Sequence, residues 1–94
     1  MAIVLKIEIL HKPEEKYRVN QMEKVIQNAA RAANMKVTIT RTNDFPAFSN
    51  YNFSPAKTPV VFIERSMEFI GGVPSVPMVK KKLIEIRDRG SMLF

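Results

Sequence analysis

Cysteine is absent from this sequence of 94 residues, and histidine occurs only once, at His11. A chain without cysteine cannot form a disulfide, use a thiolate as a nucleophile or build a cysteine-based zinc site. A single histidine cannot supply a multi-histidine metal site. These absences exclude most metal and thiol enzymology, and we expect the chain to bind no metal and no cofactor.

Glycine is scarce as well, and long hydrophobic runs are missing. None of the three glycines lies in a Gly-x-Gly-x-x-Gly or Gly-x-x-x-x-Gly-Lys pattern, which argues against a nucleotide phosphate loop. The longest apolar runs, Met1–Leu5 and Pro59–Ile63, are far shorter than the ~20 residues that a membrane-spanning helix needs. Lys6 interrupts any signal-peptide core. We therefore expect a soluble, cytoplasmic protein with no membrane partner.

The composition that is present suits one small domain. Hydrophobic residues make up 46% of the chain, which is enough for a core without metal or disulfide support, so residues 1–94 are expected to form a single domain. Fifteen lysines and arginines against nine acidic residues give a net charge of +6. This diffuse excess favours acidic partners weakly and leaves a nucleic-acid-associated role as an alternative. The run Lys80–Lys82 adds little to it, because successive residues of a helix point in different directions.

Alternating and helical hydrophobic patterns divide the chain into strands and helices. The expected strands are Ala2–Leu10, Val37–Thr42, Thr58–Ile63 and Met67–Ile70. The expected helices are Pro13–Ala33, Phe45–Tyr51 and Val76–Arg89, the first ended by Asn34 and the last by Gly90. The order β-α-β-α-β-β-α predicts an α/β fold with a mixed four-stranded sheet flanked by helices.

Aromatic residues are concentrated in one short segment. Phe45, Phe48, Tyr51 and Phe53 fall within nine positions of one another. Packing on the sheet is the favoured interpretation, because a short helix in such a fold is stabilised mainly by the core that it covers. Exposure of Tyr51 and Phe53 at a protein–protein surface is the alternative.

The order of elements, with Thr58-Pro59 opening the third strand and Gly71-Gly72 closing the fourth, resembles the thioredoxin-like fold, most closely its small glutaredoxin-type members. The resemblance covers nearly the whole chain. It implies that Pro59 follows a cis peptide bond and that the backbone just before it pairs with a bound peptide or with glutathione. A cis bond would also explain a proline at the start of a buried strand, where it cannot donate to the ladder.

The cysteine motif of that family is missing. The family carries Cys-x-x-Cys or Cys-x-x-Ser where the first strand meets the first helix, and here the segment from His11 to Arg18 contains neither. A helix N-terminus activates a thiol by lowering its pKa, but without sulfur it has nothing to activate. Glu14 and Glu15 occupy this end of the helix instead, where carboxylates are stabilising. Thiol–disulfide exchange is therefore unavailable to this chain.

These observations predict a redox-inactive thioredoxin-like module that binds a protein or an extended peptide and is not an enzyme. The strand-addition site is expected at the loop before the third strand, bordered by the start of the first helix and the diglycine turn. The candidate binding residues are His11, Lys12, Tyr17, Lys57, Thr58, Pro59, Gly71 and Gly72. A glutathione-binding remnant is a further alternative, weakened because Val73-Pro74 offers a carboxylate no polar side chain and one amide fewer.

Overall fold

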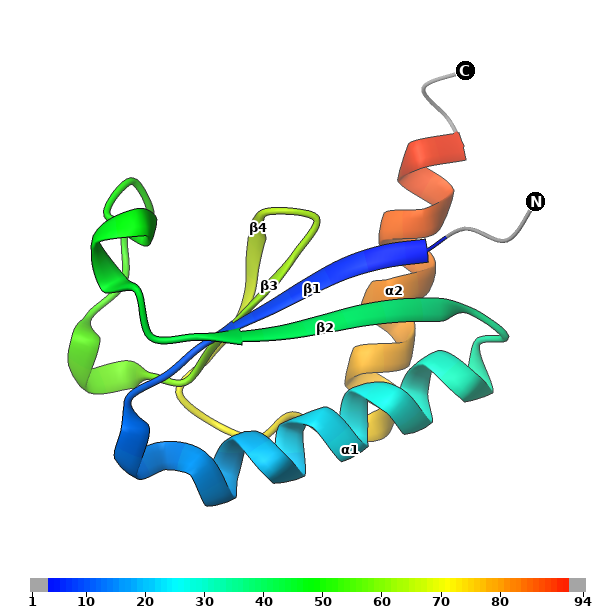
Figure 1. The fold of residues 1–94 in the computed structure, drawn as a ribbon. Coiled ribbons are helices and arrows are strands. Elements are labelled where there is room, and N and C mark those ends of the chain that lie inside the picture. Colours follow the sequence, from blue (N-terminus) through cyan, green and yellow to red (C-terminus); the bar gives the residue numbers. More distant parts are fainter. Residues whose placement is uncertain (1–3, 92–94) are drawn as a thin grey trace.

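The computed structural model describes residues 4–91 and shows a sheet with helices against it (Figure 1). The elements, in chain order, are β1 (Val4–Leu10), the 3-10 turn η1 (Pro13–Glu15), α1 (Lys16–Ala32), β2 (Lys36–Thr42), the 3-10 turns η2 (Phe45–Phe48) and η3 (Pro55–Lys57), β3 (Val60–Ile63), β4 (Ser66–Ile70) and α2 (Val76–Ser91). Residues 2 and 3 of the expected first strand lie outside the described part of the chain.

The sheet has the strand order β2-β1-β3-β4. β1 pairs with β2 in parallel, whereas β1 with β3 and β3 with β4 are antiparallel. The predicted fold class, a mixed four-stranded sheet flanked by helices, is thereby confirmed. β1 and β3 are the two inner strands, and β3 is buried along its whole length.

One face of the sheet is covered by α1 and α2, which pack on each other (Figure 1). The side chains of the two helices and of the sheet form a single buried cluster on this face, built mainly from Leu5, Ile7, Ile9, Val19, Met22, Ile26, Val61, Ile63, Val79 and Leu83. The odd-numbered residues of β1 point into this cluster because successive side chains of a strand alternate between faces. The core therefore follows the predicted amphipathic pattern.

The other face carries a smaller aromatic cluster. Phe62 is fully buried, with the rings of Phe48 and Tyr51 at centroid distances of 4.8 and 4.6 Å and that of Phe53 at 6.5 Å. The tilted ring of Phe45 lies beside that of Phe53, with the two centroids 6.5 Å apart. The core interpretation of this aromatic segment is confirmed.

The backbone of the aromatic segment differs from the prediction. Only Phe45–Phe48 is helical, as the 3-10 turn η2, and the predicted helix to Tyr51 does not form. A 3-10 turn suffices here because the segment is held by its rings on Phe62 and by the Tyr51 hydroxyl, which donates to the Arg65 carbonyl at 2.6 Å.

The chain adopts left-handed backbone conformations at the ends of several elements. Asn34, with φ of 55°, ends α1 as predicted. The two-residue turn between β3 and β4 is formed by Glu64 and Arg65, with φ of 51° and 64°. The last helix continues through Gly90 to Ser91 instead of ending at Gly90. Glycine permits a left-handed end but does not impose one, since it also adopts helical angles.

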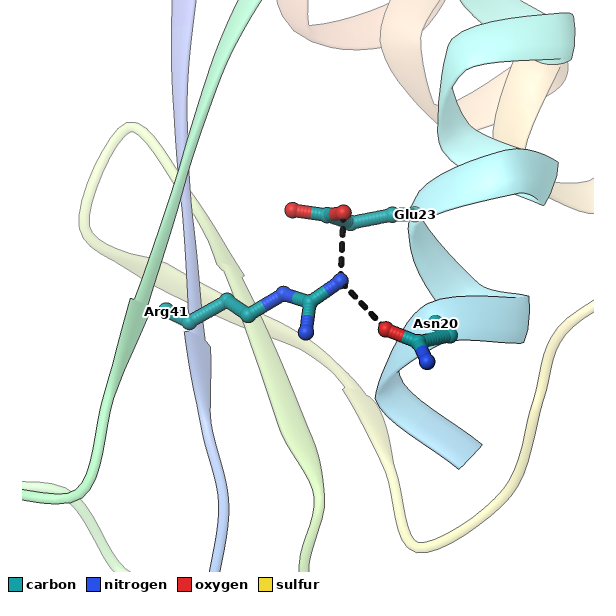
Figure 2. Close-up of polar contacts among 3 residues, drawn as sticks. All are labelled: Asn20, Glu23 and Arg41. Atoms are coloured by element: carbon teal, nitrogen blue, oxygen red, sulfur yellow. Dashed lines mark hydrogen bonds and ion pairs between the residues drawn. The ribbon is translucent and has the colours of Figure 1, made fainter. Parts of the chain in front are cut away.

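Two groups of charged side chains join elements across the surface. Arg41 on β2 donates to Glu23 at 2.6 Å and to Asn20 at 2.7 Å, both on α1 (Figure 2). The bond to Glu23 raises the pKa of Arg41. Lys82 on α2 lies 3.5 Å from Glu68 on β4 and 3.1 Å from Glu85 on its own helix. Lys82, the last lysine of the run Lys80–Lys82, is thus engaged in ion pairs with Glu68 and Glu85.

No helix of the described residues is both long and apolar enough to cross a membrane.

Candidate binding site at the Thr58–Pro59 end of the sheet

The turn that joins β1 to α1 is closed by its own hydrogen bonds. Lys12 N donates to Glu15 Oε1 at 2.7 Å, and Glu15 N donates back to the Lys12 carbonyl at 3.0 Å. His11 N donates to the Thr42 carbonyl at 3.0 Å and so extends the β1–β2 ladder, while its Nδ1 lies 2.8 Å from the Lys12 carbonyl. The resemblance places a thiol in this turn, and a carboxylate stabilises it here instead.

The loop before β3 is ordered by a short cap and is partly buried. Ser54 accepts hydrogen bonds from Ala56 N on its side chain, at 3.3 Å, and from Lys57 N on its carbonyl, at 2.8 Å. Lys57 is exposed, whereas Thr58 has only 2% of its surface exposed. The Thr58–Pro59 peptide bond is cis, and Pro59 is buried. The loop therefore presents Lys57 to solvent and keeps the two following side chains inside.

Gly71 holds the diglycine turn against this loop. Its amide donates to the Pro59 carbonyl at 2.9 Å, one step beyond the Val60–Ile70 pair of the β3–β4 ladder. Its φ is +83°, and a Cβ at this position would lie 3.2 Å from the Lys57 carbonyl oxygen. Glycine is therefore favoured at position 71 both by the backbone conformation and by the approach of the loop.

Gly72 has neither property. A Cβ built at Gly72 meets nothing within 4 Å, and its φ is not in the left-handed region. The turn therefore depends on Gly71 alone, because a single left-handed residue is enough to turn the chain out of β4. Gly72 contributes an exposed backbone segment to the site.

Arg18 joins the start of α1 to the diglycine turn. Its guanidinium Nη1 donates to the Gly71 carbonyl at 3.4 Å, across 53 positions of the sequence. The sequence interpretation did not include Arg18 in the site. No local pattern could have revealed it, because the contact depends on how α1 packs beside the end of β4.

The described structure thus brings Lys57, Pro59, Gly71 and Arg18 together at one end of the sheet. His11 and Lys12 lie at the same end, because they directly follow Leu10, which pairs with Val60 at the start of β3. The amide of His11 extends the β1–β2 ladder and that of Lys12 closes the η1 turn, so both residues border the site without offering it a free backbone amide.

Exposed apolar side chains surround this end of the sheet. Tyr17 on α1 is 76% exposed, Ile70 at the end of β4 is 46% exposed and Val73 after the diglycine turn is 38% exposed. Exposed apolar side chains that flank a rigid backbone segment are typical of protein-binding surfaces. Among the described residues no group of three or more histidine, cysteine, aspartate or glutamate side chains could hold a metal ion. Within residues 4–91, this end of the sheet thus combines exposed apolar side chains with an ordered backbone.

Comparison with known proteins agrees with the fold. The sequence model of the family described as thioredoxin domain matches residues 5–84, from β1 into the second half of α2. No curated protein and no solved structure matches the chain. The chain therefore belongs to the thioredoxin domain family, of which it is a member without cysteine.

Proposed function

We propose that this protein is a redox-inactive binding module that recognises an extended segment of another protein at the Thr58–Pro59 end of its sheet. It is not an enzyme in this proposal, because the family's thiol chemistry needs a sulfur that the chain does not contain. The thioredoxin-like scaffold then serves to hold a partner rather than to oxidise or reduce it. The proposed site consists of Lys57, Thr58, Pro59, Gly71 and Gly72, with His11, Lys12, Tyr17 and Arg18 at its border.

The observation that carries this proposal is that two distant segments, the Lys57–Pro59 loop and the start of α1, meet at Gly71. The amide of Gly71 donates to Pro59, its carbonyl accepts from Arg18, and its α-carbon lies against Lys57. A surface whose backbone is already fixed loses little conformational entropy when it binds a chain. The exposed side chains of Tyr17, near the start of α1, and of Val73, after the diglycine turn, add apolar area at this end of the sheet.

The charge of the border indicates which peptides bind best. Lys12, Lys16, Arg18 and Lys57 lie at this end of the sheet, where Glu14 and Asp44 carry exposed carboxylates and the carboxylate of Glu15 is bonded internally. A peptide that combines an apolar side chain with acidic residues therefore complements the surface.

The other two functions considered have less support. Glutathione would need backbone donors at the diglycine turn, but the amide of Gly71 already donates to Pro59 and Pro74 has no amide hydrogen. Nucleic acid would need cations aligned along one face, but Arg41 and Lys82 are held in ion pairs on different elements. A cytoplasmic location stays a prediction.

Selection of binders from a library of random extended peptides, followed by titration of the ¹⁵N-labelled protein, tests the proposal. We expect the selected peptides to be acidic and to shift the amide signals of Gly71, Gly72 and the loop before β3. Substitution Lys57→Glu should weaken their binding by about tenfold, since it reverses a charge at the site.

Lys36→Glu is the matched control, because Lys36 is equally exposed, lies at the far end of β2 and changes the net charge by the same amount. It should change the affinity by less than about twofold, as expected for a screened, distant charge. If both substitutions weaken binding equally, if the shifts lie elsewhere, or if no peptide is enriched, the proposed site is wrong.

A further inference from the structure

The outer edge of β2 is the second feature of this fold that points to a partner. β2 is the terminal strand of the sheet and pairs with β1 over seven consecutive residues without a shift of register. An edge strand leaves half of its backbone donors and acceptors without a partner strand, and this makes it a template for further pairing.

The direction of each backbone group follows from one hydrogen bond. His11 N donates to the Thr42 carbonyl, so the backbone groups of Thr42 point toward β1. In a parallel ladder the residues of a strand alternate in this respect, and Lys36, Thr38 and Thr40 therefore also face β1. The amides and carbonyls of Val37, Ile39 and Arg41 accordingly point outward from the sheet.

β2 lacks the features that protect the opposite edge of the sheet. β4 has five residues, and its pairing with β3 is interrupted by a shift between Val61 and Phe62. Short length and a bulge are two of the devices by which proteins prevent an edge from pairing. β2 has seven residues with neither proline nor glycine, and its pairing is regular.

The charge that could have shielded this edge is turned away from it. Arg41 belongs to the outward-facing set, but its guanidinium is bound to Glu23 and Asn20 on α1, over the helical face of the sheet (Figure 2). Lys36, the other cation of β2, is its first residue and lies at the end of the edge. The middle of the edge is thus uncharged and β-branched, from Val37 to Thr40.

We propose that this edge pairs with the same edge of a second copy of the chain, antiparallel and centred on Ile39. In that arrangement Ile39 faces Ile39 of the partner copy, and Val37 faces Arg41 on either side of it. The outward-facing residues then meet one another, as the hydrogen-bonded pairs of an antiparallel ladder require. The two four-stranded sheets become one continuous sheet across a two-fold axis.

The side chains fit this register. On the open face Thr38 lies opposite Thr40 of the partner copy, and both threonines are exposed in the single chain. Cross-strand threonine pairs stabilise a sheet. Lys36 falls opposite Thr42 and Arg41 opposite Val37, so no two like charges face each other directly. These matches are what favour a second copy over an unrelated strand as the occupant.

The absence of native cysteine makes the register directly measurable. With Thr38→Cys and Thr40→Cys in one chain, each new thiol lies opposite a thiol of the partner copy at a Cα separation of about 4.5 Å, which a disulfide can span. We expect mild oxidation to convert this variant into a covalent dimer. Thr38→Cys alone places the two thiols on a diagonal of more than about 7 Å and should remain largely monomeric.

Charge substitutions test the same register in solution. Thr38→Lys with Thr40→Lys sets like charges opposite each other in the dimer, whereas Thr38→Lys with Thr40→Glu sets opposite charges there. Both pairs leave the helical face unchanged. Sedimentation of the unmodified chain should show a monomer–dimer equilibrium with a Kd below about 1 mM, and the two variants should differ in Kd by about tenfold or more.

The outcomes decide the proposal. A chain that stays monomeric up to about 1 mM overturns it, as do equal Kd values for the two charged variants or equal cross-linking of the single and double cysteine variants. Binding of an unrelated extended peptide along β2 by a chain that remains monomeric would assign the edge to a different partner and would also overturn it.

Discussion

Gly71 is the position at which one added methyl group should be felt most strongly. Its φ is +83°, where an L-residue costs about 1–2 kcal/mol more than glycine. The new Cβ would also lie 3.2 Å from the Lys57 carbonyl oxygen, a backbone atom, so the loop before β3 would have to shift to accommodate it. Together these effects should lower the free energy of unfolding of Gly71→Ala by about 2 kcal/mol.

Urea unfolding followed by circular dichroism measures this loss. For a slope of about 1 kcal/mol per molar urea, the midpoint of Gly71→Ala should fall by about 2 M. Gly71→Asn should lose less, because asparagine tolerates the left-handed region better than alanine. The slope should not change, since the unfolded surface is the same.

Gly72→Ala is the internal control, one residue away and in the same turn. With nothing within 4 Å of its Cβ and no positive φ, it should change stability by less than about 0.5 kcal/mol. Equal losses for Gly71→Ala and Gly72→Ala would refute the assignment of the turn to a single left-handed residue.

Two further predictions concern the β3–β4 turn and the charged group on α2. Arg65→Gly should raise the free energy of unfolding by about 0.5–1 kcal/mol, because Arg65 has a φ of 64°, which glycine adopts at a lower cost. The substitution keeps the Arg65 carbonyl, which accepts a hydrogen bond from the Tyr51 hydroxyl. A lower urea midpoint for Arg65→Gly would contradict this prediction. The hydrogen bond from Lys82 lowers the pKa of Glu85 below its ordinary value of 4.5. The ionised Glu85 therefore stabilises the fold above pH 4.5, and this stabilisation is lost as the pH falls through the lowered pKa. The unfolding free energy should therefore decrease more steeply on acidification in the unmodified chain than in Glu85→Gln, and parallel profiles below pH 4.5 would exclude this pair as a source of stability.

The regular elements could be predicted because their signals are local. Val19, Met22, Ile26 and Ala29 recur at helical spacing in α1, and all four are buried. An amphipathic helix packs its apolar face on the sheet, so the spacing of its apolar residues in the sequence predicts which face is buried. Asn34 ends α1 for an equally local reason, its tolerance of left-handed angles.

The segment between β2 and β3 could not be predicted in the same way. Its rings are placed by Phe62, which lies far along the chain from Phe45 and on another element. The conformation of the backbone is then set by where the rings must reach rather than by helix propensity, and η2 stops at Phe48. The burial of the aromatic residues could be foreseen, but not the path of the chain that connects them.

The candidate site shows the same division. The positive φ of Gly71 agrees with its place at the exit of a strand, while Gly72, identical in type and adjacent, does not share it. Arg18 reaches the site only because α1 lies beside the end of β4. Residue type indicates what a position permits, and the tertiary arrangement decides which of the permitted positions is used.

The register shift between Val61 and Phe62 also limits how many copies of this protein could join edge to edge into one longer sheet. A sheet with two regular borders can be lengthened without end, one molecule after the next, and this is how strand-rich chains grow into fibrils. Here β4, the other edge strand, is irregularly paired and suits strand addition poorly. Growth of the sheet would therefore stop once the regular edge at β2 is paired.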